Sequence, residues 1–282
     1  MIIKAYAKIN LSLDVVGKRD DGYHLLEMVM QQIDLYDVIE IHSNSTGMIN
    51  VTCDKKYVPC DERNLAYKAA ALYKEKYNIK DGVSIGITKN IPVSAGLAGG
   101  STDAAAVLKA MRRMFPMKKV SHRSLKELGL MLGADVPYCI QGGTALCKGI
   151  GENVKPLNSI HNVIVVLVKP NFGISTKDIY GKLQLDKINK HPATDEIVKT
   201  IKERNIRALC YNMKNVLENV AVGMHPQISG IKKEMMRLGA EGALMSGSGP
   251  SVFGIFPDML TAQRAFEYFK QFYNEVFITR SL

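Results

Sequence analysis

The chain has 282 residues, 46% hydrophobic and 23% charged, a balance that supplies a packed core and excludes a disordered polypeptide. Its longest aliphatic run, residues 163–168, is far shorter than the ~20 residues of a membrane-spanning helix. Residues 1–6 lack the apolar core of a signal peptide, so we expect a soluble, cytoplasmic protein with no membrane partner. The net charge of +10 suits either a nucleic acid or an anionic small molecule as partner.

Strand-like and helical patterns alternate along the chain. Strands are predicted at residues 2–16, 38–42, 83–88, 144–147, 163–168, 243–245 and 252–256. Helices are predicted around residues 65–72, 107–111, 125–132, 197–201, 216–220, 228–238 and 262–272. Gly, Asn and Pro punctuate residues 151–158 before a new hydrophobic strand. The pattern therefore predicts an α+β protein with two domains, residues 1–155 and 156–282, and a ligand site in a cleft between them.

The first predicted strand carries polar side chains at alternate positions. Lys8, Asn10 and Ser12 share one face, because successive side chains of a strand point to opposite sides. This face is either exposed to solvent or turned into a cleft, and the strand pattern alone leaves both open.

The most informative segment is residues 92–103, with the sequence PVSAGLAGGSTD. Its glycines and small residues leave backbone N–H groups exposed, and the alanine-rich run that follows is a strong helix former. A loop of bare amides leading into a helix N-terminus favours an anion, and Ser101 and Thr102 add hydroxyls that can cap the helix or face a metal. The segment indicates a phosphate site, with an unliganded turn as the alternative. It has neither the Gly-Lys-Ser/Thr ending of a Walker A loop nor the G-x-G-x-x-G spacing of a dinucleotide site.

The cysteines, histidines and basic residues indicate little chemistry of their own. The five cysteines lie at least seven positions apart and the six histidines are scattered, so we expect reduced thiols and no metal held by protein ligands alone. The densest basic cluster has no interleaved aromatic residue, which favours a solvated face over a nucleic-acid interface. It comprises Arg112, Arg113, Lys118, Lys119, His122, Arg123 and Lys126.

Two later segments complete the set. Asp135 follows a helix end and precedes Pro137, and such an aspartate either caps the local backbone or acts as a base. Residues 245–251, MSGSGPS, form a second small-residue loop between strand-like runs. Neither segment by itself identifies a function.

Taken in order, these segments resemble the GHMP kinase superfamily over residues 4–253. The order is Lys8-x-Asn10, Gly22-Tyr23-His24, residues 96–103, Gly133-Ala134-Asp135-x-Pro137 and Ser246-Gly247-Ser248-Gly249. The resemblance implies an N-terminal domain like domain 2 of ribosomal protein S5 and a ferredoxin-like C-terminal domain. It implies ATP as phosphoryl donor, with Mg²⁺ carried by the nucleotide. The opening residues 5–11 and residues 21–24 match the branch that phosphorylates the 2-hydroxyl of a cytidyl diphosphate of methylerythritol, in non-mevalonate (MEP) isoprenoid biosynthesis.

The same resemblance assigns roles to individual residues. It places the general base on Asp135 and the catalytic lysine on Lys8, which suits a reaction that needs positioning and charge neutralisation. The ATP phosphates would be wrapped by the glycine-rich loop, residues 92–102. The adenosine would lie near Asn64, Leu65 and Lys89. The loop consists of Pro92, Val93, Ser94, Ala95, Gly96, Leu97, Ala98, Gly99, Gly100, Ser101 and Thr102.

The substrate residues follow in the same way. Asn10 would hold the methylerythritol end, while Tyr23 and His24 would hold the cytosine. Tyr180, eleven positions after Lys169, would complete a sandwich of the base with Tyr23. The expected partner is thus a small cytidyl diphosphate and no nucleic acid, bound by a monomer or homodimer. Two alternatives stay open: a homoserine or mevalonate type of kinase, and a basic nucleic-acid-binding protein.

Overall fold

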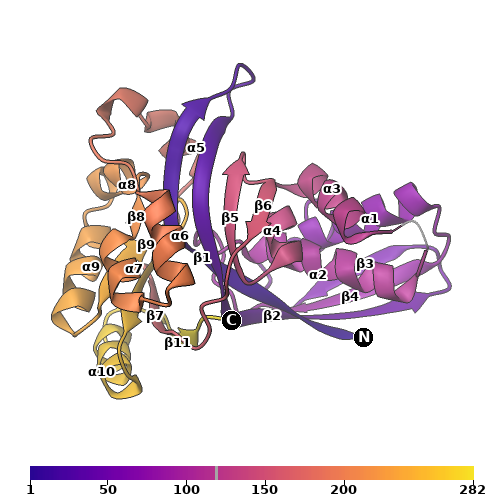
Figure 1. Ribbon diagram of the computed structural model, residues 1–282. Helices are drawn as coiled ribbons and strands as arrows, with labels where there is room; N and C mark the ends of the chain where they lie inside the picture. Colours follow the sequence, from indigo (N-terminus) through magenta and orange to yellow (C-terminus); the bar gives the residue numbers. More distant parts are fainter. Residues whose placement is uncertain (118–119) are drawn as a thin grey trace. The chain divides into compact units, whose positions relative to one another are not determined.

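Two long strands, β1 (Ile2–Lys18) and β2 (His24–Asn44), begin the chain, and each contributes to both units into which the fold divides (Figure 1). The first unit comprises residues 1–7, 35–93 and 98–142, and the second comprises residues 8–34, 94–97 and 143–282. The computed structural model describes residues 1–117 and 120–282. The predicted division at residues 155 and 156 concerns sequence domains and stays a prediction.

The first unit is a small sheet covered by helices. The second half of β2 pairs antiparallel with β4 (Gly82–Thr88), which pairs in parallel with β3 (Ile49–Cys53). Helix α1 (Leu65–Tyr77) packs over β3 and β4, and α2 (Gly99–Met114), α3 (His122–Leu132) and α4 (Val136–Gln141) complete the helical layer on that face of the sheet (Figure 1). Helices α1 and α2 pack against each other, and both carry buried alanines such as Ala69 and Ala105, whose small side chains suit close packing.

The second unit contains the later part of β1, residues 8–18, and the first part of β2, residues 24–34, which pairs with later strands. Residues 26–31 of β2 pair antiparallel with β5 (Thr144–Gly149), which pairs with β6 (Asn153–Pro156). The short strand β8 (Lys214–Asn215) joins β1 in parallel, with Lys214 opposite Ser12 and Asn215 opposite Leu13. Chain segments about two hundred residues apart are thereby placed side by side.

The rest of the second unit is built on a four-stranded antiparallel sheet in the order β11-β7-β10-β9. Along the chain its elements are β7 (Ile164–Lys169), α9 (Gln227–Arg237), β9 (Gly242–Met245), β10 (Val252–Phe256), α10 (Met259–Lys270) and β11 (Glu275–Arg280). A β-α-β-β-α-β path with this strand order is ferredoxin-like. Residues 252–256 are buried throughout, as expected for a central strand. The predicted α+β class with a ferredoxin-like C-terminal part is confirmed.

Every predicted strand and helix has a counterpart, with differences in extent. The predicted strand at residues 38–42 is only the end of β2, and the helix predicted from residue 216 begins at Glu218 as α8 (Glu218–Met224). The sequence did not predict β3, β6, β8, β11, α4, α5 (Thr176–Lys182) or α7 (Ile206–Asn212). The remaining elements are a 3-10 turn (Leu185–Lys187) and α6 (Thr194–Lys202). Within residues 1–117 and 120–282, none of the helices combines the length and apolar character needed to cross a membrane.

Candidate active site

The polar face of β1 is buried. Lys8 is 3% exposed and Asn10 is fully buried, and the Lys8 ammonium donates to Asn10 Oδ1 at 2.8 Å. It also donates to the carbonyl oxygen of Gly96 at 3.0 Å, and the Lys8 N–H donates to the Leu97 carbonyl oxygen at 3.2 Å. Of the two possibilities for this face, solvent exposure is wrong. The structure instead brings the predicted catalytic lysine and the predicted substrate residue Asn10 together with the glycine-rich loop.

The glycine-rich loop has an unusual backbone. Ser94, Gly96 and Ala98 have φ values of 52°, 74° and 59°, in the left-handed region that L side chains rarely adopt. Left-handed residues at every second position turn successive N–H groups toward a common concavity, the arrangement that binds anions. Non-glycine residues hold this conformation at a cost of about 1–3 kcal/mol each, so Ser94 and Ala98 favour a functional loop over an ordinary turn.

The loop ends at the N-terminus of α2. Ala98 occupies the N-cap position and has no side-chain group to cap the helix, so the first N–H groups of α2 point outward without an intrahelical acceptor. The helix dipole adds to their attraction for an anion. Thr102 is buried and its hydroxyl donates to the Tyr6 carbonyl oxygen at 2.8 Å, whereas Ser101 is half-buried. Of the two predicted hydroxyls, Ser101 is therefore the better placed for a ligand.

A second loop, which we call the serine–glycine loop (residues 246–249), packs against Gly96. A Cβ at Gly96 would overlap the Ser246 carbonyl oxygen, and Ser246 Oγ donates to the Gly96 carbonyl oxygen at 2.9 Å. Gly247 has φ 56°, and a Cβ there would lie 3.2 Å from the Lys8 ammonium. The sequence singled out this loop but assigned none of its residues to the site. Its contacts with Gly96 and Lys8 add Ser246 and Gly247 to the candidate site.

Lys89, predicted to lie near the adenosine, is the centre of a buried charged cluster. It is 6% exposed, and its ammonium forms ion pairs with Asp37 and, at 2.8 Å, with Asp103. Asp37 Oδ1 also accepts the N–H groups of Asn90 at 2.6 Å and Ile91 at 2.8 Å. We call Asp37, Lys89 and Asp103 the buried triad. It ties β2, the start of the glycine-rich loop and the first turns of α2 together inside the first unit.

Burial and the neighbouring charges shift the pKa values of Asp103 and Lys89 by different balances of effects. Burial, helped by the charge of Asp37 and opposed by Lys89, raises the pKa of Asp103 to about 7. Burial alone would lower the pKa of Lys89, but the charges of Asp103 and Asp37 outweigh it and raise that pKa. Among the described residues, Asp103 Oδ1 is buried without a hydrogen-bond partner. A Cβ at Gly99 would lie 3.3 Å from the Lys89 ammonium, so the triad sits directly beneath the first residue of α2.

The other two predicted adenosine residues begin α1. Asn64 caps this helix: its Oδ1 accepts the N–H of Ala66 at 2.9 Å, and its Nδ2 donates to the Pro59 carbonyl oxygen at 2.7 Å. The Leu65 side chain would contact a Cβ at Gly100 at 3.5 Å. Leu65 is therefore adjacent to the glycine-rich loop, while the Asn64 side chain serves the local backbone.

Asp135 lies at the N-cap of α4, a short helix where the sequence predicted only a tight turn. Its carbonyl oxygen accepts the N–H of Cys139 at 3.0 Å. Within the described part of the chain, its side chain makes no capping hydrogen bond to α4. Pro137 in the first turn favours a helix start because its missing N–H has no acceptor to lose there. The half-buried carboxylate is thus held by a helix start without being used to cap it.

Two of the three predicted cytosine residues contact each other. The ring of His24 contacts that of Tyr180, with centroids 5.0 Å apart and an angle of 32° between the planes, whereas Tyr23 is 60% exposed. A base cannot lie between rings at this separation, so the His24–Tyr180 pair offers an edge and an outer face. Burial, and then the charge of Lys18, lowers the pKa of His24, which keeps its ring neutral and able to accept a hydrogen bond.

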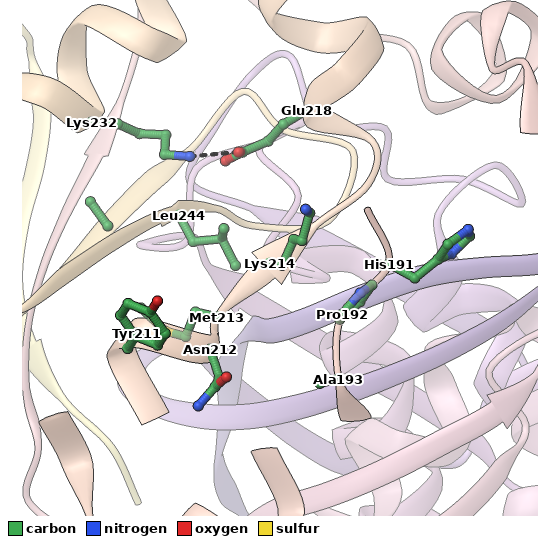
Figure 2. A pocket seen from close by; sticks show the side chains of 11 residues that line it. His191, Pro192, Ala193, Tyr211, Asn212, Met213, Lys214, Glu218, Lys232 and Leu244 are labelled. Atoms are coloured by element: carbon green, nitrogen blue, oxygen red, sulfur yellow. Dashed lines mark hydrogen bonds and ion pairs between the residues drawn. The ribbon is translucent and has the colours of Figure 1, made fainter. Parts of the chain in front are cut away.

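A separate polar cavity of about 430 Å³ lies in the second unit between β8, α8, α9 and β9 (Figure 2). Its lining includes His191, Lys214 and the ion pair of Lys232 with Glu218, whose N and O atoms are 2.5 Å apart. As far as the described residues go, its lining contains no predicted site residue. We therefore assign the candidate site to the loops around Lys8 and not to this cavity.

The remaining expectations concern metals and the basic cluster. In residues 1–117 and 120–282, no group of three or more His, Cys, Asp or Glu side chains could hold a metal ion. Lys118 and Lys119 lie outside the described residues. Arg112, Arg113 and Arg123 are exposed, and the preference for a solvated face over a nucleic-acid interface stays a prediction.

Comparison with known families matches both parts of the chain. Residues 64–143 match the family described as GHMP kinases N terminal domain, and residues 189–275 match GHMP kinases C terminal. Together these ranges cover more than half of the chain.

Individual relatives match from end to end. The chain is 58% identical over 282 residues to a 4-diphosphocytidyl-2-C-methyl-D-erythritol kinase of Clostridium novyi (strain NT), covering 100% of both chains. It is 60% identical, again over 100% of both chains, to an enzyme of the same name from Clostridium botulinum (strain Alaska E43 / Type E3). A crystal structure of a 4-(cytidine 5'-diphospho)-2C-methyl-D-erythritol kinase aligns with a TM-score of 0.84 and 32% identity, covering 100% of this chain and 99% of the other.

Proposed function

The chain belongs to the GHMP kinase family, and from that premise we propose that it phosphorylates the 2-hydroxyl of 4-diphosphocytidyl-2-C-methyl-D-erythritol in the non-mevalonate (MEP) pathway. It is an ATP-dependent kinase with an alcohol acceptor. Relatives at 58% and 60% identity over their full lengths carry the name of this enzyme, and a solved structure of that name has the same fold. These likenesses favour this function over both alternatives, the homoserine or mevalonate type of kinase and the nucleic-acid-binding protein.

The observation that carries the proposal is the contact of Lys8 with the glycine-rich loop. The left-handed residues 94, 96 and 98 and the uncapped start of α2 suit the phosphates of ATP, and the Lys8 ammonium lies 3.0 Å from the Gly96 carbonyl oxygen of the same loop. A cation placed there can stabilise negative charge that develops beside the bound triphosphate.

We assign the chemical step to Asp135 and Lys8. The substrate hydroxyl oxygen attacks the γ-phosphorus of ATP, the bond from that phosphorus to the bridging oxygen breaks, and ADP leaves. Asp135 accepts the proton of the hydroxyl, and Lys8 stabilises the alkoxide as it forms. Asn10, which accepts a hydrogen bond from Lys8 through Oδ1, orients that ammonium and faces the methylerythritol end of the substrate.

Mg²⁺ would accompany the nucleotide. The half-buried Ser101 hydroxyl at the start of α2 fits such an ion as a single oxygen ligand, because Mg²⁺ bound to phosphates takes few protein ligands and keeps several waters. When bound, the ion neutralises charge on the triphosphate.

The cytidyl group is assigned to Tyr23, His24 and Tyr180. The neutral His24 ring can accept a hydrogen bond from the base, and Tyr23 is exposed and available to stack on it. Because His24 and Tyr180 are already in contact, we propose that the base stacks on Tyr23 and reaches the edge of this pair. A homoserine or mevalonate kinase has no use for such an aromatic group.

The cytoplasmic location and the oligomeric state, a monomer or a homodimer, stay predictions.

A product assay tests the function. The protein is incubated with ATP, Mg²⁺ and one of three alcohols, the cytidyl substrate, homoserine or mevalonate, and products are identified by mass and phosphorus NMR. We expect phosphorylation of the cytidyl substrate alone, and a turnover lower by roughly 10²-fold or more in Asp135→Asn. Cytidine monophosphate should compete with the substrate and not with ATP. Phosphorylation of homoserine or mevalonate instead would contradict the proposed substrate.

A further inference from the structure

The serine–glycine loop touches both Lys8 and Gly96, so the position of its backbone matters to the candidate site. The loop begins where β9 ends at Met245. What holds the peptide groups on either side of Ser246 therefore decides where the loop lies.

Asn215, the second residue of β8, is 2% exposed. Both the nitrogen and the oxygen of its side-chain amide form hydrogen bonds to nearby backbone groups. Its Nδ2 donates to the Met245 carbonyl oxygen at 2.9 Å and to the Gly247 carbonyl oxygen at 2.8 Å. Its Oδ1 accepts the N–H of Leu217 at 3.0 Å, which closes the turn before α8. One side chain thus spans Ser246 by binding the residues before and after it.

Glu218 holds the other backbone group of Met245. Its Oε1 accepts the Met245 N–H at 2.8 Å, and its Oε2 receives the Lys232 ammonium at 2.5 Å on the wall of the polar cavity (Figure 2). Met245 is consequently held at its N–H by Glu218 and at its carbonyl by Asn215.

The strand that bears Asn215 is tied to the strand that bears Lys8. Asn215 pairs with Leu13, which lies five residues after Lys8 on β1. Asn215 therefore connects β1 to the serine–glycine loop by backbone pairing on one side and by two side-chain hydrogen bonds on the other. The separation between Lys8 and Gly247 depends on this connection.

We propose that Asn215 is a positioning residue for phosphoryl transfer, holding the serine–glycine loop against Gly96 and Lys8 with Glu218 as its brace. The inference rests on the proposed kinase function. A misplacement of about 1 Å in reacting or stabilising groups can cost on the order of 10²-fold in rate. Loss of the two Asn215 donors would free the loop at the point where it meets the lysine.

Asn215→Asp is the sharpest test, since it keeps the size and the acceptor for Leu217 but turns an oxygen toward the two carbonyl groups. The matched control is Asn205→Ala, which removes the N-cap hydrogen bond to the Ala208 N–H in the same unit, 3.0 Å long, without touching the loop. We expect kcat with the cytidyl substrate to fall at least tenfold in Asn215→Asp, with both KM values within about threefold. Asn205→Ala should lose thermal stability and keep kcat.

Amide hydrogen exchange supplies a readout that does not depend on activity. Exchange of a peptide covering residues 246–251 should accelerate in Asn215→Asp and stay unchanged in Asn205→Ala. If Asn215→Asp fails to fold, Glu218→Ala and Glu218→Gln replace it, and only the alanine variant should loosen the loop, since glutamine keeps the acceptor for Met245.

Unchanged exchange in the Asn215→Asp loop, or an equal loss of kcat in both asparagine variants, would overturn the positioning role. A wild-type protein that phosphorylates no cytidyl substrate would overturn the proposed function instead. The exchange measurement would still test whether Asn215 holds the serine–glycine loop in place.

Discussion

The glycine-rich loop is anchored by two kinds of chemistry. In the first unit, the buried triad fixes its beginning and the helix that follows it through charged groups, with Lys89 between Asp37 and Asp103. In the second unit, the carbonyl oxygen of Gly96 is held by the Lys8 ammonium and by the hydroxyl of Ser246.

Because the two anchors differ in chemistry, we expect the loss of each to have a different effect. Buried charges lose their hydration, so removing one member of the triad leaves others uncompensated and is felt as a loss of stability. The hydrogen bonds to Gly96 orient one peptide group, so their loss should be felt as weaker nucleotide binding or slower turnover. Four substitutions test this division, from the largest expected effect to the smallest.

Lys89→Met should break the charged anchor. At pH 8, above the pKa of Asp103, it leaves two carboxylates buried without their shared cation, so the free energy of unfolding should fall by about 3–5 kcal/mol, measured by denaturant unfolding. The double variant Lys89→Met/Asp103→Asn should recover part of this loss, because it removes one of the stranded carboxylates. Equal unfolding midpoints for wild type and Lys89→Met would show that the triad is not a stabilising anchor.

Asp103→Asn should change how stability depends on pH. Folded Asp103 keeps its proton up to about pH 7, whereas its ordinary pKa is 3.8, so the native state binds the additional proton between these values. The free energy of unfolding of the wild type should therefore fall as pH rises through this window, by at most about 1.4 kcal/mol per pH unit from this group. Thermal unfolding from pH 4 to 8 should show this component in the wild type and not in Asp103→Asn. Parallel curves would mean that Asp103 is ionised throughout.

Gly96→Ala should disturb the second anchor, the one on the Gly96 peptide group. The position has φ 74°, which costs an L residue about 1–2 kcal/mol, and the new Cβ would meet the Ser246 carbonyl oxygen. We expect the dissociation constant of ATP to rise about tenfold or more by calorimetric titration. Gly230→Ala is the control, because a Cβ there meets nothing within 4 Å and its ATP affinity should stay that of the wild type.

Ser246→Ala should have the smallest effect. It removes one hydrogen bond to Gly96, 2.9 Å long, worth about 0.5–1.5 kcal/mol, so kcat/KM should fall roughly 2- to 12-fold. Thermal stability should hardly change. A kcat/KM equal to that of the wild type would show that Lys8 alone, without the Ser246 hydroxyl, is enough to hold the Gly96 carbonyl group.

The parts of the site that could be predicted are those whose signal is local in sequence. Lys8 and Asn10 are two positions apart on a strand, so alternation alone places them together, and the structure gives their hydrogen bond. The glycine-rich loop is likewise a continuous segment, because its glycines and the helix start that follows lie within about ten residues.

The parts that could not be predicted depend on pairing across long stretches of chain. Asp37, Lys89 and Asp103 meet only because β2, β4 and α2 pack together. The spacing of these three residues in the sequence does not indicate that they form a cluster. Asn215 stands on a two-residue strand, too short for any periodicity to reveal. The contact of His24 with Tyr180 is of the same kind, because it joins residues more than one hundred and fifty positions apart.

The early position of β2 in the chain has a consequence for biosynthesis. Its residue Val29 lies opposite Leu146, more than one hundred residues later. At about 5–20 residues per second, a ribosome needs roughly 5–25 s to deliver that partner. During this interval Met28, Val29 and Met30, which are buried in the finished protein, belong to an open strand edge on the nascent chain. The yield of folded protein should therefore respond to growth temperature and to chaperones that cover such edges.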